Sequence, residues 1–164
     1  MLRLNVGFIL HEQVGFSRNF DFDYPSVQID DQLELSHLHG LVRLTRTTQG
    51  VYARGQLQAY HELECVRCLS PYTETLVAEI NDLYSLPGEE GDDPLLRISE
   101  TGILNLEPLL REKFLISVPI QPLCREDCKG LCSICGANRN EVECNHTVDD
   151  IDPRMAVLQT LLED

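Results

Sequence analysis

The chain has 164 residues, which suits one domain with a small appendage and is long enough to bury a hydrophobic core. No run approaches the roughly 20 consecutive apolar residues of a membrane-spanning helix, so we expect a protein that does not cross a membrane. The formal net charge of −14 disfavours non-specific binding to a phosphate backbone and favours basic proteins as partners.

Most of the first eighty residues are expected to form antiparallel strands. Apolar and alternating runs predict strands over residues 2–10, 16–24, 33–44, 51–63 and 72–83. The first run has no small-residue cleavage site, so we interpret it as a strand rather than as a signal peptide. The alternation changes phase at Gly40, which indicates a bulge or bend there, and residues 47–50 predict the turn that follows.

The composition changes in the second half of the chain. Residues 85–100 are rich in acidic and turn-forming residues and predict a loop. A helix is predicted over 105–118, with Asn105 as its cap. Its apolar positions at i, i+3, i+4 and i+8 are Leu106, Leu109, Leu110 and Phe114. A second, short helix is expected over 151–164, where Asp152 precedes a first-turn proline.

The predicted fold class is therefore α+β, mostly an antiparallel β-sheet with one packed helix. We expect a β-rich core domain over residues 1–123, which includes the acidic loop and the helix. A cysteine-rich segment over 124–150 resembles a zinc knuckle, and the short terminal helix over 151–164 follows it.

The seven cysteines are the most informative residues of the chain. Cys65 and Cys68 form one C-x2-C pair, and the tail follows the pattern C-x3-C-x3-C-x2-C-x8-C-x-H from Cys124 to His146. A C-x2-C turn places two sulfurs on one side of a tight loop, where a single zinc ion binds both. The odd cysteine count and the expected lack of an export signal disfavour a disulfide scaffold and favour the reducing cytoplasm.

Seven thiols and one imidazole make eight ligands, which is enough for two tetrahedral zinc sites. One expected site comprises Cys132, Cys135, Cys144 and His146. The other comprises Cys65, Cys68, Cys124 and Cys128. A rival partition groups Cys128 with Cys132, Cys135 and Cys144 and leaves Cys124 and His146 spare. The spacing alone leaves both partitions open.

Both expected sites are closed, because four protein ligands fill a tetrahedral zinc ion and leave no position for water. The phosphate-binding glycine loops and the common metalloprotease and serine-hydrolase motifs are also missing from the sequence. We therefore predict a non-enzymatic protein with two structural zinc ions and no small-molecule substrate. The alternative is a thiol-dependent redox protein, or a zinc-dependent adaptor, that uses Cys65 and Cys68.

Several cations are candidates for contacts with nucleic acid or with another partner. They lie on the predicted hairpin and in the knuckles: Arg43, Arg46, Arg54, Arg67, Lys129 and Arg139. The competing interpretation pairs the hairpin arginines with nearby glutamates such as Glu62 and Glu64. His37 and His39 share one face of a predicted strand, a spacing that suits a metal but more often belongs to half-exposed polar residues.

Several stretches together resemble the bacterial YceD family, also called large ribosomal RNA subunit accumulation proteins. The stretches are CVRCL at 65–69, the leucine-rich helix with VPI at 118–120, PLCREDCKGLC at 122–132, CGANRN at 135–140 and DPRM at 152–155. The resemblance spans nearly the whole chain. The chain departs from the family at His146, where a cysteine is common, and at Arg139, where an apolar residue is usual.

The resemblance implies a cytoplasmic, non-enzymatic factor that is needed for large-subunit ribosomal RNA to accumulate. Together with the acidic charge, it leads us to predict an assembly factor for the pre-large ribosomal subunit. Its expected partner is nascent 23S ribosomal RNA or a basic ribosomal protein. An adaptor in transcription or proteolysis is a further interpretation, because zinc knuckles also serve there.

Overall fold

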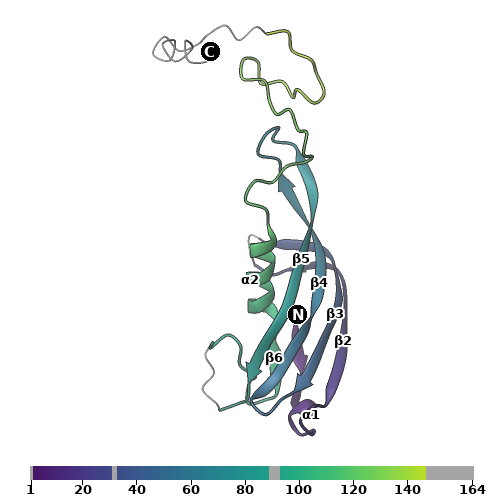
Figure 1. Cartoon of the computed structure of the whole chain (residues 1–164), viewed down its shortest axis with the longest axis vertical. Helices are drawn as coiled ribbons and strands as arrows, with labels where there is room; N and C mark the ends of the chain where they lie inside the picture. The colour runs from purple at the N-terminus through teal and green to yellow at the C-terminus, as the bar shows by residue number, and fades with distance from the viewer. Residues whose placement is uncertain (1, 31–32, 89–92, 147–164) are drawn as a thin grey trace, which may run out of the picture.

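A four-stranded antiparallel sheet forms the body of the protein (Figure 1). The computed structural model describes residues 2–30, 33–88 and 93–146, and none of the helices within these ranges has the length and apolar character to span a membrane. The sheet is a meander in which each strand pairs with the next along the chain. Its strands are β2 (Ser17–Gln28), β3 (Glu34–Arg46), β4 (Gly50–Glu64) and β5 (Pro71–Ser85).

Two short strands and the long helix lie along this sheet, and a short helix lies at one end of it (Figure 1). β1 (Arg3–Asn5) pairs antiparallel with β6 (Ile103–Asn105), so the start of the chain lies beside the segment that leads into the long helix. α1 (Gly7–Leu10) follows β1, and α2 (Glu107–Ser117) follows β6. The predicted α+β class, with a mostly antiparallel sheet, is confirmed.

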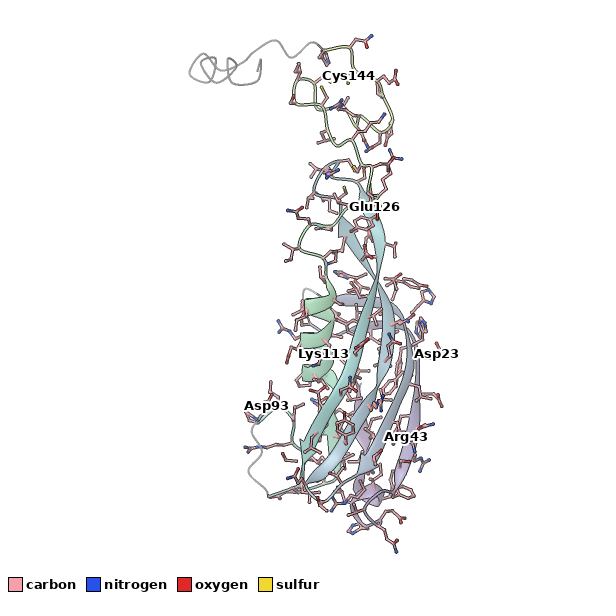
Figure 2. All side chains as sticks on the ribbon, in the orientation of Figure 1. Asp23, Arg43, Asp93, Lys113, Glu126 and Cys144 are labelled. Atoms are coloured by element: carbon pink, nitrogen blue, oxygen red, sulfur yellow. The ribbon has the colours of Figure 1, made fainter. Side chains whose placement is uncertain are left out.

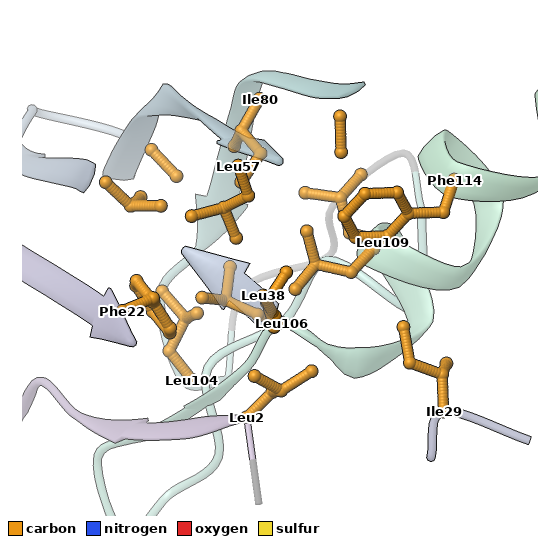
Figure 3. Close-up of a cluster of buried hydrophobic side chains, with 14 of the residues drawn as sticks. Leu2, Phe22, Ile29, Leu38, Leu57, Ile80, Leu104, Leu106, Leu109 and Phe114 are labelled. Atoms are coloured by element: carbon orange, nitrogen blue, oxygen red, sulfur yellow. The ribbon is translucent and has the colours of Figure 1, made fainter. Parts of the chain in front are cut away.

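The hydrophobic core lies between the sheet and α2 (Figure 3). Leu109, Leu110 and Phe114 of α2 are buried, in agreement with the helical spacing of these residues in the sequence. The strands alternate buried and exposed side chains, which is typical of an antiparallel sheet with one solvated face. The sheet therefore has a core face toward α2 and an open face on its other side.

β4 and β5 form the longest pair, with a register that runs unbroken from Gly50↔Ser85 to Glu64↔Pro71. The far end of this hairpin extends beyond the end of α2, and the cysteine-rich tail lies there (Figure 1). The turn between the two strands is the Cys65–Cys68 knuckle. The fold thus carries the first C-x2-C pair away from the core to meet the segment that follows α2.

The predicted strand over residues 2–10 is wrong in its second half, because β1 ends at Asn5 and α1 begins at Gly7. Val6 and Ile9 are both buried, three residues apart, which is helical rather than strand spacing. The backbone N–H of Ile9 donates to the carbonyl of Val6 at 2.8 Å. This single turn is too short to give a periodic signal in the sequence.

The bulge in β3 lies before Gly40 rather than at it. The register with β4 shifts between Ser36 and His39, and His37 has a φ of 50°. Gly40 has a different role, because a Cβ there would lie 2.2 Å from the carbonyl oxygen of Gln56. The glycine therefore permits close approach of two strands, while the change of phase comes from the bulge.

The predicted helix over 105–118 is present as Glu107–Ser117. Asn105 belongs to β6 rather than to the helix cap position, although its side-chain oxygen accepts a hydrogen bond from the Glu107 N–H at 3.2 Å. The expected helix over 151–164 lies outside the described residues, as do residues 89–92 of the acidic loop.

Candidate metal centres

Cys65, Cys68, Cys124 and Cys128 form the first group of candidate ligands, at the end of the β4–β5 hairpin. Their sulfur atoms all lie within 4.8 Å of one another. The Sγ atoms of Cys65 and Cys128 are 3.8 Å apart, and those of Cys68 and Cys124 are 3.6 Å apart. Zinc–sulfur bonds of about 2.3 Å in a tetrahedron separate the sulfurs by about 3.8 Å, so this set fits a zinc ion.

Hydrogen bonds in the backbone hold the first knuckle in shape. The N–H of Cys65 donates to the carbonyl of Ser70 at 3.0 Å, and the N–H of Leu69 donates to the carbonyl of Cys65 at 2.9 Å. The N–H of Val66 donates to the carbonyl of Pro122 at 3.0 Å. This last bond ties the knuckle to the segment after α2, which brings Cys124 and Cys128 to the hairpin.

Cys132, Cys135, Cys144 and His146 form the second group, farther along the tail (Figure 2). The Sγ atoms of Cys135 and Cys144 lie 3.6 Å apart, which again suits a tetrahedral zinc ion. The N–H of Gly136 donates to the carbonyl of Cys132 at 2.9 Å, which closes the C-x2-C turn. Gly136 has a φ of 72°, a conformation that glycine adopts without strain.

The two groups differ in their exposure to solvent. Cys65, Cys68 and Cys128 are buried, whereas Cys135 and His146 are exposed. A hollow of about 90 Å³ also lies against the second group. It is lined by Cys132, Ser133, Ile134, Arg139, Cys144 and His146. The first group is therefore shielded by protein, and the second is open to small molecules.

The thiols of the first group have unequal pKa values. Hydrogen bonding from the backbone at Cys124 lowers the pKa of Cys65 to about 6. The side-chain amide of Asn140 lies 3.3 Å from the Cys128 sulfur and lowers the pKa of that thiol. Burial raises the pKa of Cys124 to about 12. Zinc binding would require all four thiols as thiolates and would therefore release the proton that Cys124 holds.

The second group shows the same contrast. Hydrogen bonding from the backbone at Cys135 lowers the pKa of Cys132 to about 7. The neighbouring thiol of Cys135 raises the pKa of Cys144 to about 11. A bound zinc ion would remove this inequality, because thiols that coordinate zinc do so as thiolates.

Of the two partitions that the spacing left open, the structure has the first, and Cys128 lies with Cys65, Cys68 and Cys124 rather than with Cys132. Each set offers four nitrogen or sulfur donors, the ligands that zinc prefers in structural sites. The chemistry that zinc would supply here is a cross-link between chain segments. Both sets are compatible with zinc.

The predicted cations do not form one basic face. Arg67 donates from Nη1 to the carbonyl of Cys128 at 3.0 Å, so it supports the first knuckle. Arg46 donates to the carbonyl of Thr47 and, at 3.1 Å, to that of Gly50, so it braces the β3–β4 turn. Neither arginine forms an ion pair with Glu62 or Glu64 within the part of the chain described.

Arg43 and Arg54 lie opposite each other on the open face of the sheet. Arg43 donates to the hydroxyl of Ser17 at 2.6 Å. Of the two tail cations, Arg139 lines the hollow at the second group, and the backbone N–H of Lys129 donates to Asn140.

His37 and His39 are both exposed, and neither belongs to a described cluster of three or more candidate ligands. The ring Nδ1 of His39 lies 2.7 Å from the carbonyl oxygen of His37 and donates to it. The ring of His37 meets that of Tyr60 edge-on, with 6.1 Å between centroids. The two histidines therefore contact each other and the neighbouring strand β4.

Asn140 is a site residue that the sequence argument did not single out. Its side chain contacts the Cys128 sulfur at 3.3 Å and accepts from the Lys129 N–H at 2.9 Å. It also donates to Asn138 at 2.8 Å and accepts from Arg125 at 2.6 Å. Asn140 lies in the segment between Cys135 and Cys144 of the second group, yet it supports Cys128, a candidate ligand of the first group. The sequence feature that points to it is the CGANRN stretch at 135–140, which contains Asn138 and Asn140.

Comparisons with known proteins agree with these motifs. The family model described as large ribosomal RNA subunit accumulation protein YceD matches residues 53–162. An uncharacterized protein of Mycobacterium tuberculosis is 29% identical over 160 residues, covering 94% of this chain and 74% of that protein. An uncharacterized protein of Mycobacterium leprae is 31% identical over 126 residues, covering 74% of this chain and 57% of that protein. No solved structure matches the chain.

Proposed function

The chain belongs to the YceD family of large ribosomal RNA subunit accumulation proteins, and on this premise we propose that it is a non-enzymatic assembly factor for the large ribosomal subunit. We place its action in the cytoplasm, where it would bind a precursor of the large subunit through a basic ribosomal protein. The observation that carries the proposal is the pair of four-ligand clusters within a chain of this family. Zinc ions bound at these clusters would hold the tail and the tip of the β4–β5 hairpin together as one binding module.

The absence of catalysis is supported by the composition of the two clusters. Each offers four protein ligands, and a zinc ion with four protein ligands has no position for a water nucleophile or a substrate oxygen. A zinc ion held in this way stabilises the fold and fixes the shape of the knuckles.

A basic protein partner is supported by the charge of the chain. The net charge of −14 attracts a cationic protein and speeds its encounter, whereas it repels free RNA at long range. The six predicted cations are dispersed, and Arg46 and Arg67 already contact backbone carbonyls. Direct binding of RNA would therefore depend on few free cations.

The alternative of a redox protein that uses Cys65 and Cys68 has less support. Cys65 is fully buried and Cys68 nearly so, with exposed fractions of 0% and 6%. A redox-active cysteine needs access to its substrate. Backbone hydrogen bonding lowers the pKa of Cys65, and a thiolate at this position suits a metal ligand as well as a redox centre.

The test compares binding of the purified protein to early large-subunit particles and to naked large-subunit RNA across a salt series. We expect tight binding to the particles and weak binding to the RNA. Tight binding to naked RNA that weakens steeply as salt increases would mean that the partner is RNA rather than a basic protein. A deletion strain should accumulate less large-subunit RNA, and a normal level there would contradict the assembly role itself.

A further inference from the structure

The two knuckles adopt the same backbone conformation with different residues at one key position. The residue after the second cysteine is Leu69 in the first knuckle and Gly136 in the second, with φ values of 57° and 72°. This left-handed conformation is unstrained for glycine and unfavourable for a residue with a branched side chain such as leucine. The first knuckle thus carries a leucine where its backbone favours glycine.

The side chain of Leu69 does not offset this strain by packing, because 55% of its surface is exposed. Leucine is therefore unfavourable at this position for the isolated protein on two counts, conformation and exposure. Backbone strain of this kind is held by the surrounding structure and clusters at functional sites. The exposed side chain is the feature that needs an explanation.

Other exposed aliphatic residues lie in the segments around Leu69. Val66 belongs to the same knuckle and is 52% exposed. Its N–H is bonded to the carbonyl of Pro122, so the loop that follows α2 runs beside it. That loop carries Ile120, which is 99% exposed, and the end of α2 carries Ile116, which is 73% exposed. We call Val66, Leu69, Ile116 and Ile120 the knuckle patch.

The charged groups around the knuckle patch include both signs, and the acidic ones are in slight excess. Glu64 precedes the knuckle, Glu112 lies one helical turn before Ile116, and Glu126 lies between two metal-ligand candidates. No ion pair involves any of these three within the described ranges. With zinc bound, four thiolates around a divalent cation leave two further negative charges there. Lys129, Arg67 and Arg125 add positive charges to the same segments, and Arg125 pairs with Asp127 at 3.5 Å.

We propose that the knuckle patch is the docking surface for a basic protein segment that inserts aliphatic or aromatic side chains between Leu69 and Ile120. This inference rests on the proposed function and adds to it the place and the chemistry of contact. Apolar anchors in the patch would supply affinity, and the acidic groups around them would select a cationic partner. The first metal cluster would hold Val66 and Leu69 in the geometry that the partner meets.

Two other occupants of the patch are disfavoured by charge. A second copy of this chain would bring another −14 charges to an acidic surface. RNA would bring phosphates to the same surface, and it finds no aromatic stacking residue in the patch. A basic protein segment meets both the apolar and the charged groups.

The test uses two variants of the full-length zinc-loaded protein and one matched control. The variants are Leu69→Asn, which keeps a residue that tolerates the left-handed conformation, and the double variant Ile116→Gln/Ile120→Gln. The control is Leu95→Gln, since Leu95 is 58% exposed and lies near Asp93 at the opposite end of the sheet (Figure 2). Zinc content and melting temperature are measured for each.

The binding probe is the set of large-subunit precursor particles purified from cells that lack the protein. We expect each patch variant to bind these particles about tenfold more weakly, as loss of interface anchors does. The melting temperature should be unchanged or higher for Leu69→Asn. The control should bind like the unaltered protein. Equal binding by all proteins would overturn the patch and leave the assembly role standing, whereas no binding by any of them would contradict the assembly role.

A photo-crosslinker placed at Ile120 identifies the occupant in the same particles. We expect a crosslink to a basic protein of the large subunit, and we expect Leu69→Asn to reduce it. A crosslink to ribosomal RNA or to a second copy of this chain would overturn the proposed occupant. The two readouts therefore separate the position of the surface from the identity of its partner.

Discussion

The Sγ atoms of Cys65 and Cys128 lie 3.8 Å apart although 63 residues separate them in the sequence. Between them the chain completes β5, β6 and α2 and then returns to the tip of the β4–β5 hairpin. The cluster of buried cysteines is separate from the hydrophobic core of the sheet. A zinc ion bound there would close a long loop by linking the hairpin to the tail.

The first prediction concerns Cys128→Ser. We expect this variant to bind one zinc ion instead of two and to lose several kcal/mol of unfolding free energy, because structural zinc binding contributes directly to folding. The sheet should persist, since its core contains none of the four cysteines. Elemental analysis gives the stoichiometry, and urea denaturation followed by circular dichroism gives the stability. Two zinc equivalents with unchanged stability would contradict the first site.

The second prediction concerns the order in which zinc leaves the protein. The second group is the more exposed, and a hollow of about 90 Å³ lies beside it. A colorimetric chelator should therefore remove one zinc equivalent quickly and the other slowly. The variant Cys132→Ser should lack the fast phase and keep the slow one. Release of both equivalents in a single phase would show that exposure does not distinguish the sites.

The third prediction concerns Gly40→Ala. The φ of Gly40 is 144°, and an added Cβ would lie 2.2 Å from the Gln56 oxygen and 2.9 Å from a methyl carbon of Leu57. We expect a loss of roughly 2–4 kcal/mol of unfolding free energy, because backbone atoms cannot yield as a flexible side chain does. Denaturant titration of the zinc-loaded protein measures this loss.

Gly15→Ala provides the matched control for that variant. Gly15 has a φ of 96°, and nothing lies within 4 Å of an added Cβ. It should therefore show only the conformational cost, on the order of 1 kcal/mol. If the two variants were equally stable, close contact of β3 with β4 at Gly40 would not be the reason for the glycine.

The fourth prediction concerns stability at alkaline pH. Burial raises the pKa of Tyr84 above its ordinary value of 10.0, and its hydroxyl lies 3.3 Å from the Asn105 carbonyl, to which it donates. The folded protein therefore holds this proton at a pH where the unfolded chain releases it. The stabilisation is fully present below pH 10 and is lost as the pH rises toward the folded-state pKa.

Tyr84→Phe tests that explanation. The variant should lose about 1 kcal/mol at neutral pH, where it lacks one hydrogen bond. Above pH 10 its stability should fall less steeply than that of the unaltered protein, as measured by unfolding at a series of pH values. Parallel curves for the two proteins would mean that another group causes the alkaline loss.

The long elements could be predicted from the sequence because their signals are strong, and so could the set of eight candidate ligands, whereas the spacing left their partition between two groups open. β3, β4 and β5 alternate over many residues, and α2 has four apolar residues at helical spacing. The C-x2-C pairs are local turns that need little context. The expected grouping of Cys65 with Cys124 followed from the order of the hairpin, helix and tail.

The remaining features depend on contacts that a local pattern does not contain. α1 and β6 have four and three residues, too few to show a period. The register shift at His37 is set by pairing with β4, whereas the sequence shows only a change of alternation near Gly40. The support of Cys128 by Asn140 joins two metal-ligand segments, so it becomes visible only when both are placed.

The last prediction concerns His146, the ligand at which the chain departs from the common pattern of its family. His146→Cys should keep two zinc ions, because a fourth thiolate also completes a tetrahedral site. It should make that site more negative by one charge, and a cobalt-substituted sample should gain sulfur-to-metal charge-transfer absorption. His146→Ala should lose the zinc of the second group or hold it weakly, while the first group keeps its ion. If His146→Ala retained both ions with unchanged affinity, the second group would bind metal through its three thiols alone, and the histidine would not be a ligand.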